Sequence, residues 1–148
     1  MKNVFTLFIS LTLLGTSVFS QSQPTGAKKL KFLIHITQGS ENPTRAALAF
    51  LVARSAIEEG HTVTLFLAGD GVQLFRKEVI DNLSGLGTGK LSEHLDAIIK
   101  GGGKFYLSGM SSKVRGITEE HLKDKSAEFA MPNVLVRLAA DSDKIFVY

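Results

Sequence analysis

The sequence contains no cysteine, and only three of its 148 residues are proline. Without cysteine the chain can form no disulfide, offer no thiolate to a zinc ion and carry no sulfur on a thiol of its own. Its 17 basic and 14 acidic residues are spread along the chain and form no block of one charge. This near balance gives no reason to expect binding to nucleic acid or to an anionic membrane. The fold must therefore be stabilised by burial of apolar side chains, which make up 44% of the sequence.

The first twenty residues differ in composition from the rest of the chain. An apolar run from Val4 to Phe19, interrupted only by Ser, Thr and Gly residues, follows Lys2. At about sixteen residues it is short for a membrane span, which needs roughly 20, and Ser20 offers a small residue to a signal peptidase. We predict a signal peptide over 1–20, a polar linker over 21–29 and a single domain over 30–148. The protein would then be exported, to the periplasm or otherwise, and would leave the membrane after cleavage; an uncleaved anchor is the alternative.

Alternating strand and helix patterns follow from residue 30 onward. The run LKFLIHI over 30–36 is almost continuously apolar, as in a strand buried on both faces of a parallel sheet. Further strands are predicted over 62–69, 104–107, 127–130 and 143–148, and helices over 44–59, over 90–100, from Thr118 and over 133–140. The segment 72–81 could be helix or strand, and LSGLGTG over 83–89 is predicted to be a flexible loop. The pattern indicates a three-layer α/β/α fold with a mainly parallel sheet of about five strands.

The helix predicted over 44–59 has clear boundaries, because Asn42 and Pro43 suit its first turn and Gly60 suits its end. Its apolar residues point in two directions: Leu48, Leu51 and Val52 would face one way, and Phe50, Ala53 and Ile57 another. One face of a sheet cannot cover both sides of a helix. We therefore expect a second subunit to cover part of it.

Three loops should meet where the parallel strands end, at the usual ligand crevice of such sheets. They are TQGSEN over 37–42, AGDGV over 68–72 and SGMSSKVRG over 108–116. The candidate ligand-binding residues in these loops are Gly39, Ser40, Asn42, Gly69, Asp70, Ser108, Gly109, Lys113 and Arg115. Backbone N–H groups with Arg115 or Lys113 suit a small oxyanion such as sulfate, phosphate or thiosulfate, whereas Asp70 opposes one unless a cation pairs with it. The alternative is that the glycines only permit turns and the hydroxyls only cap helices.

Other chemistry finds little support in the sequence. GLGTGK over 85–90 lacks the glycine and the Ser or Thr of a phosphate loop, because Ser84 and Leu91 occupy those positions. Ser108 lacks the flanking glycines of a hydrolase nucleophile, so a hydrolase or transferase using it is the weakest hypothesis. The histidines lie in no catalytic or metal-binding motif; they are His35, His61, His94 and His121. We expect no catalytic residue, no metal and no cofactor.

The order and spacing of four segments resemble the DsrE/DsrF-like family of small sulfur-relay and related proteins. They are TQGSENPTRAALAF over 37–50, AIEEGHTVTLFLAGDGV over 56–72, LSEHLDAIIKGGGKFYLSGMSSKVRGI over 91–117 and DKIFVY over 143–148. The resemblance covers residues 31–148. It implies a compact α/β fold, assembly as trimers or hexamers and, in the sulfur-carrying members, a reactive cysteine at the position of Ser108. A serine there cannot carry a persulfide, and its hydroxyl does not ionise near neutral pH without a base.

The resemblance therefore predicts an exported binding or assembly protein that has lost the thiol of the sulfur carriers. We expect it to form a homotrimer or a homohexamer. The alternative is an accessory subunit of a periplasmic sulfur-relay or sulfur-oxidation system, whose loop at Ser108 receives or shields a sulfur group carried by a partner protein. Neither hypothesis assigns sulfur transfer to this chain alone.

Overall fold

The computed structural model describes residues 28–148, in which five parallel strands form one sheet. The predicted signal peptide and its cleavage site lie outside the described residues. In spatial order the strands of the sheet are β6 (Ala127–Ala130), β5 (Lys104–Ser108), β2 (Thr62–Leu67), β1 (Lys31–Ile36) and β7 (Lys144–Val147). Every pair of neighbours is parallel. The carboxyl ends of the strands consequently lie along one edge of the sheet, as predicted.

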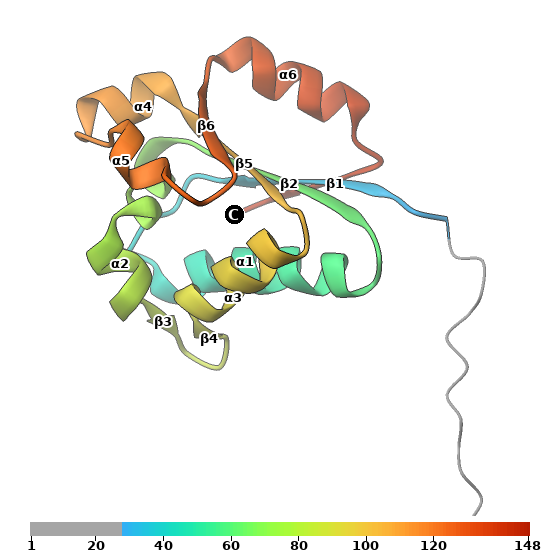
Figure 1. The fold of residues 1–148 in the computed structure, drawn as a ribbon, viewed down its shortest axis with the longest axis horizontal. Coiled ribbons are helices and arrows are strands. Elements are labelled where there is room, and N and C mark those ends of the chain that lie inside the picture. Colours follow the sequence, from blue (N-terminus) through green and yellow to red (C-terminus); the bar gives the residue numbers. More distant parts are fainter. Residues whose placement is uncertain (1–27) are drawn as a thin grey trace, which may run out of the picture.

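Helices lie on both faces of this sheet, which confirms the predicted α/β/α architecture (Figure 1). One face is covered by α1 (Pro43–Glu58) and α3 (Leu91–Lys100), and the other by α6 (Pro132–Asp141). The remaining helical elements lie toward the carboxyl ends of the strands: η1 (Gly69–Phe75, a 3-10 helix), α2 (Lys77–Asn82), α4 (Gly109–Val114) and α5 (Glu119–Leu122). Within residues 28–148 no helix is both long and apolar enough to cross a membrane.

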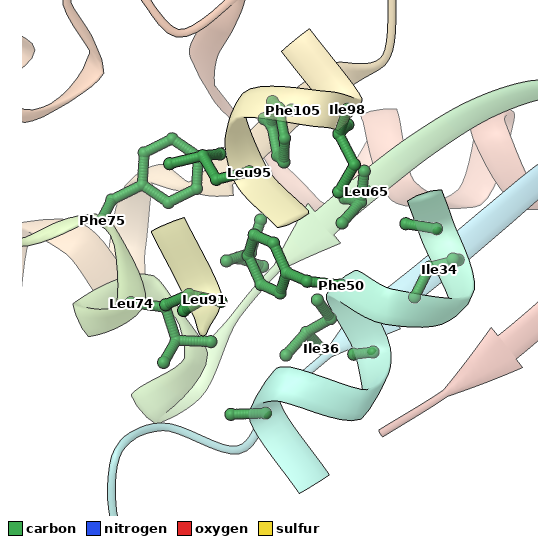
Figure 2. Packing of buried hydrophobic residues seen from close by; sticks show 14 of the residues in the cluster. Ile34, Ile36, Phe50, Leu65, Leu74, Phe75, Leu91, Leu95, Ile98 and Phe105 are labelled. Atoms are coloured by element: carbon green, nitrogen blue, oxygen red, sulfur yellow. The ribbon is translucent and has the colours of Figure 1, made fainter. Parts of the chain in front are cut away.

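The main core lies between the sheet and α1 with α3 (Figure 2). Alternate strand residues such as Ile34 and Leu65 point into it, and α1 contributes Phe50 together with a series of buried alanines. Three phenylalanine rings meet there, because the ring of Phe105 packs 6.2 Å from that of Phe50 and 5.3 Å from that of Phe75. Small alanine side chains let α1 approach the sheet closely, so the large rings can fill the remaining space.

The boundaries of α1 agree with the sequence prediction. The side chain of Asn42 accepts a hydrogen bond from the N–H of Arg45 at 3.2 Å, and Pro43 occupies the first turn. Gly60 follows the helix with a φ of +87°, a conformation that favours glycine. Leu48 lies on the outward side of the helix and is exposed.

Three segments differ from their predicted structure: 68–72, 83–89 and 108–116. β2 ends at Leu67, and η1 begins at Gly69 in place of the predicted loop. The segment 83–89 is not an irregular loop but contains most of a small hairpin, β3 (Ser84–Gly85) with β4 (Gly89–Lys90), which turns through Gly87 and Gly89 at positive φ. Its tip is fixed to α1, since the N–H of Leu86 donates to Oγ1 of Thr44 at 3.1 Å. The loop predicted over 108–116 is also largely helical, as α4 occupies most of it. The open question over 72–81 is answered by η1 and α2, which are both helical.

The second face of the sheet has a thinner cover. Within residues 28–148, α6 is the helix that packs on it, and none of the residues of α6 is fully buried. The side chains beneath it include Leu33 and Phe66, which form a small second cluster with Ala130. At one edge, all four residues of β7 are exposed.

Candidate functional site

Ser108 lies at the tip of β5, where that strand passes directly into α4. Its Oγ accepts a hydrogen bond from the N–H of Ser111 at 3.3 Å, so the serine acts as the N-cap of the helix. Only 8% of its surface is exposed. Ser111 in turn accepts a hydrogen bond at Oγ from the N–H of Gly69 at 3.0 Å. These two bonds connect the end of β5 with the end of β2.

An ion pair joins the same two strand ends on the solvent side. Nε of Arg115 donates to Oδ1 of Asp70 at 2.9 Å, and Gln73 donates to the same oxygen at 3.2 Å. The guanidinium of Arg115 also lies 3.4 Å from the carbonyl oxygen of Ser111, while Arg76 donates to the carbonyl oxygen of Arg115. Asp70 is therefore paired with a cation. An unpaired carboxylate at this position would oppose a bound anion, as stated above, whereas a paired one does so less.

The loop after β1 packs against the loop after β2. The N–H of Gly71 donates to the carbonyl oxygen of Thr37 at 3.1 Å. A Cβ on Gly39 would lie 2.8 Å from the carbonyl oxygen of Asp70, which explains the need for glycine. The N–H of Gly39 donates to the carboxylate of Glu41 at 2.7 Å. This backbone donor thus already holds a carboxylate from its own chain.

The structure does not bring all of the predicted ligand-binding residues together at one place. Gly39, Gly69, Asp70, Ser108 and Arg115 lie in the network of adjoining loops described above. The others lie around it: Asn42 caps α1, Lys113 is exposed on α4, Gly109 faces the end of β6, and Ser40 lines a separate hollow of about 310 Å³ beside α2. Sequence reasoning missed Glu41, Gln73, Arg76 and Ser111 as members of the network. Their roles depend on contacts between distant segments, and only the polar character of the loops pointed toward them.

In the described part of the chain, no hydrogen bond joins a histidine to Ser108. His35 lies on β1, two strands away from β5, and neighbouring strands are about 4.8 Å apart. Burial lowers the pKa of His35, so the imidazole is neutral near pH 7, and its Nε2 is buried without a hydrogen-bond partner. His94 bonds through Nε2 to the carbonyl oxygen of Thr88 at 2.6 Å. In the described part of the chain no three His, Asp or Glu side chains form a group that could hold a metal ion.

A separate hollow of about 540 Å³ lies between α2 and α5, away from Ser108. Phe75 and Ile80 contribute its apolar lining, and charged side chains of both signs form the rest, including Lys77, Asp81 and Lys123. Ligand pockets are usually lined mainly by apolar groups with a few polar ones. The mixed charges of this hollow are typical of a solvated surface, and no motif in the sequence pointed to it.

Apolar side chains surround the tip of β5 on the outside of the molecule. Met110 and Val114 are four residues apart on α4, so they share one helix face, and both are exposed. Met131, just before α6, is exposed as well, and its sulfur would lie 4.0 Å from a Cβ on Gly109. Together these three residues form the apolar rim of the strand tip. A group of exposed apolar side chains of this kind is typical of contact surfaces.

Comparison with known proteins gives one family and one curated relative, together with solved structures of similar fold. The model of the DsrE/DsrF-like family matches residues 30–148. An uncharacterized protein of Methanocaldococcus jannaschii is 31% identical over 93 residues, which are 63% of this chain and 34% of that protein. The chain thus matches about a third of the length of this curated relative.

Two solved structures have a similar fold. The crystal structure of the ychN protein from E. coli covers 80% of this chain and 99% of its own, with a TM-score of 0.67 at 16% identity. A conserved protein of unknown function from Bacteroides thetaiotaomicron covers 80% of this chain and 94% of its own, with a TM-score of 0.60 at 11% identity. At these identities the likeness concerns the fold alone.

Proposed function

Because the chain belongs to the DsrE/DsrF-like family, a membership that suggests a sulfur-relay-like protein, we propose that it is a binding or assembly protein of this family that works without a thiol. The observation that carries the proposal is the environment of Ser108. The residue ends β5 at the strand tip and is held by a hydrogen bond to α4, but the chain contains no cysteine. A hydroxyl cannot carry a persulfide, and within residues 28–148 no histidine is hydrogen-bonded to it. The strand tip thus suits binding better than sulfur transfer.

The ligand that we propose for the strand ends is a small oxyanion such as sulfate, phosphate or thiosulfate. Near the strand tip the guanidinium of Arg76 donates to the backbone carbonyl of Arg115, and the guanidinium of Arg115 holds the carboxylate of Asp70. In the loop packed against Asp70, the N–H of Gly39 holds the carboxylate of Glu41. These donors already bind carboxylates of the same chain, and the oxygen atoms of a sulfate or phosphate can accept the same hydrogen bonds. The internal carboxylates compete with such an oxyanion for the donors. We therefore expect weak binding.

Replacing Arg115 with alanine should lower sulfate affinity by at least about tenfold, since a hydrogen bond to a charged group contributes about 1.5–3 kcal/mol and each 1.4 kcal/mol is a factor of ten. Replacing Asp70 with asparagine should raise the affinity about threefold, because the exposed ion pair no longer competes for the guanidinium. Titration of sulfate and thiosulfate by calorimetry at low salt measures both effects. Arg54 provides the control, because it is also paired with a carboxylate, Glu58 at 2.6 Å, but lies on α1. The variant R54A should bind like the wild type.

Absence of saturable binding in both the wild type and D70N would contradict the anion proposal. Equal losses in R115A and R54A would also contradict it, because the effect would then reflect net charge rather than a site. In either case the polar network at the strand ends is better understood as scaffold.

The apolar rim of the strand tip favours a second candidate function, that of an accessory subunit receiving or shielding a sulfur group carried by a partner. Met110, Val114 and Met131 would contact that partner beside Ser108. Mass spectrometry of complexes isolated from the native compartment tests this candidate. We expect to recover a partner protein that carries added sulfur mass, and we expect the variant M110K to lose this partner. Recovery of this chain alone would argue against the accessory-subunit candidate.

We further propose that the protein is exported to the periplasm. The support is the sequence of residues 1–20, with its basic start, its short apolar run and the small residue Ser20. The mass of the protein recovered from cells tests this proposal. A mature chain that begins near residue 21 is expected, and retention of Met1 in the recovered protein would contradict cleavage.

Assembly into a trimer or a hexamer is the last part of the proposal. Its support is the outward side of α1, where Leu48 is exposed and Leu51 and Val52 are only partly buried. A helix with apolar residues outside its core face gains by contact with another subunit. Light scattering at micromolar concentration measures the mass, and a monomer would contradict assembly.

A further inference from the structure

The strand β7 forms an open edge of the sheet that is apolar on both faces. Among residues 28–148 its only strand partner is β1. Its three apolar side chains remain exposed, with 47% of Ile145, 40% of Phe146 and 60% of Val147 accessible to solvent. Edge strands of soluble proteins usually carry charges, prolines or bulges that prevent further pairing. In β7 only Lys144, at the first position, is charged.

The other edge of the sheet provides a contrast within the same molecule. β6 has the same length, but Ala130 is buried and Phe129 is partly buried, while Glu128 places a charge on the strand. Both edges expose backbone groups, yet only β7 exposes a run of large apolar side chains. The open edge at β7 therefore calls for an explanation that β6 does not need.

The backbone of β7 has free groups in the right places for pairing. The N–H of Tyr148 donates to His35 at 2.9 Å, and the carbonyl oxygen of Tyr148 accepts from Thr37 at 2.8 Å, so this residue turns toward β1. Alternate residues of a strand turn to the same neighbour, so Phe146 also faces β1. The N–H and C=O groups of Ile145 and Val147 consequently point to the open edge.

We propose that β7 pairs with β7 of a second copy of this chain, antiparallel and around a two-fold axis at Phe146. In that register Ile145 lies opposite Val147 of the other copy, and the two residues exchange the hydrogen bonds of their free backbone groups. Phe146 lies opposite its own counterpart. Every cross-strand pair of the apolar run is then apolar with apolar, which is the arrangement that stabilises paired strands.

The choice of a second copy rests on this self-complementarity. A two-fold axis centred at Ile145 would place Phe146 opposite Lys144 and would expose the apolar run to charge. The side chains also agree in direction: Ile145 and Val147 are in register with Leu33 and His35, on the α6 side, whereas Phe146 is in register with Ile34, on the α1 side. A two-fold axis perpendicular to the sheet keeps equal faces together, so both copies form one continuous sheet.

This inference rests on the assembly part of the proposed function and makes it more specific. A two-fold contact requires an even number of copies, so it selects the hexamer over the trimer. The threefold contact of a hexamer would then use another surface, for which the outward side of α1 is available.

Cysteine crosslinking tests the register, because the chain has no cysteine of its own. The single variants I145C, F146C and V147C of the full chain are treated with diamide, which takes up the two electrons and protons released when two thiols form a disulfide. In a non-hydrogen-bonded antiparallel pair the Cα atoms are about 4.5 Å apart, within the range of disulfides. Only F146C places equal positions opposite each other, so only F146C should form a covalent dimer efficiently. V136C, at an even more exposed apolar site on α6, is the control.

A second variant does not depend on crosslinking. In V147P the proline removes an N–H that faces the open edge and leaves the hydrogen bonds of Tyr148 to β1 in place. We expect the mass measured by light scattering to fall by half, with cooperative unfolding retained. The inference is overturned if V147P keeps the wild-type mass, if I145C crosslinks best, or if F146C crosslinks no better than V136C. A monomeric wild type would overturn the proposed assembly as well, whereas a trimer would overturn only this inference.

Discussion

Replacing Phe105 with alanine is expected to lower the free energy of unfolding by about 3–5 kcal/mol, the usual loss for a buried phenylalanine. Phe105 is 1% exposed and lies between the rings of Phe50 and Phe75, which come from α1 and η1. These rings belong to separate elements fixed by other contacts, so they cannot close the cavity easily. The truncation therefore removes both buried apolar area and the packing of two neighbours (Figure 2).

Urea unfolding followed by circular dichroism measures this loss. The control is V136A, which truncates an exposed apolar side chain on α6 and should change the free energy by less than about 0.5 kcal/mol. A loss below about 1 kcal/mol in F105A would mean that the three rings repack. The layer of α1 and α3 on the sheet would then be less rigid than the structure indicates.

The sequence alone predicts the layered fold well because the signals for it are local. A continuous apolar run marks a buried parallel strand such as 30–36, and Asn42 with Pro43 marks the start of α1. Apolar spacing in 91–100 gives the buried face of α3, where Leu91, Leu95 and Ile98 are inside. Each of these signals lies within a few residues of the structure that it determines.

The helix α4 could not be predicted in the same way. Its sequence, GMSSKV, is rich in residues that favour turns and caps. Ser108 does act as a cap, but the same serine is equally compatible with a loop. What stabilises α4 is its packing, since Ser112 is buried and Ser111 bonds to Gly69, 42 residues away in the chain. Contacts between distant segments leave no local signal.

The candidate site, too, could be predicted from the sequence only in part. The sequence predicts that the three loops lie at one edge, because this follows from parallel strands. It does not predict that the donors are already engaged, with Arg115 on Asp70 and Gly39 on Glu41. This engagement makes the variant D70N informative. If the loops are only scaffold, D70N loses the ion pair with Arg115 and binds no sulfate. If they form a binding site, D70N binds sulfate more tightly than the wild type.

Replacing Gly71 with alanine should have the second large effect, because it forces the loops at the strand ends apart. A Cβ on Gly71 would lie 2.6 Å from the carbonyl oxygen of Ile36 and 3.1 Å from its carbonyl carbon. Both are backbone atoms of β1, which cannot move without disturbing the sheet. Overpacking of this kind costs about 1–3 kcal/mol. Since Gly71 adjoins Asp70, we also expect sulfate binding to weaken in G71A, as the ion pair with Arg115 shifts.

The matched control is G109A, at the other strand end of the same site. A Cβ on Gly109 would meet nothing closer than 3.7 Å, an ordinary contact, and its φ is not positive. Its free energy of unfolding should stay within about 0.5 kcal/mol of the wild type. If G71A unfolds at the same urea concentration as G109A, the loop after β2 can move away from β1. The close packing of the two loops would then not be what positions Asp70, and the site would depend on the Ser111 bond to Gly69 instead.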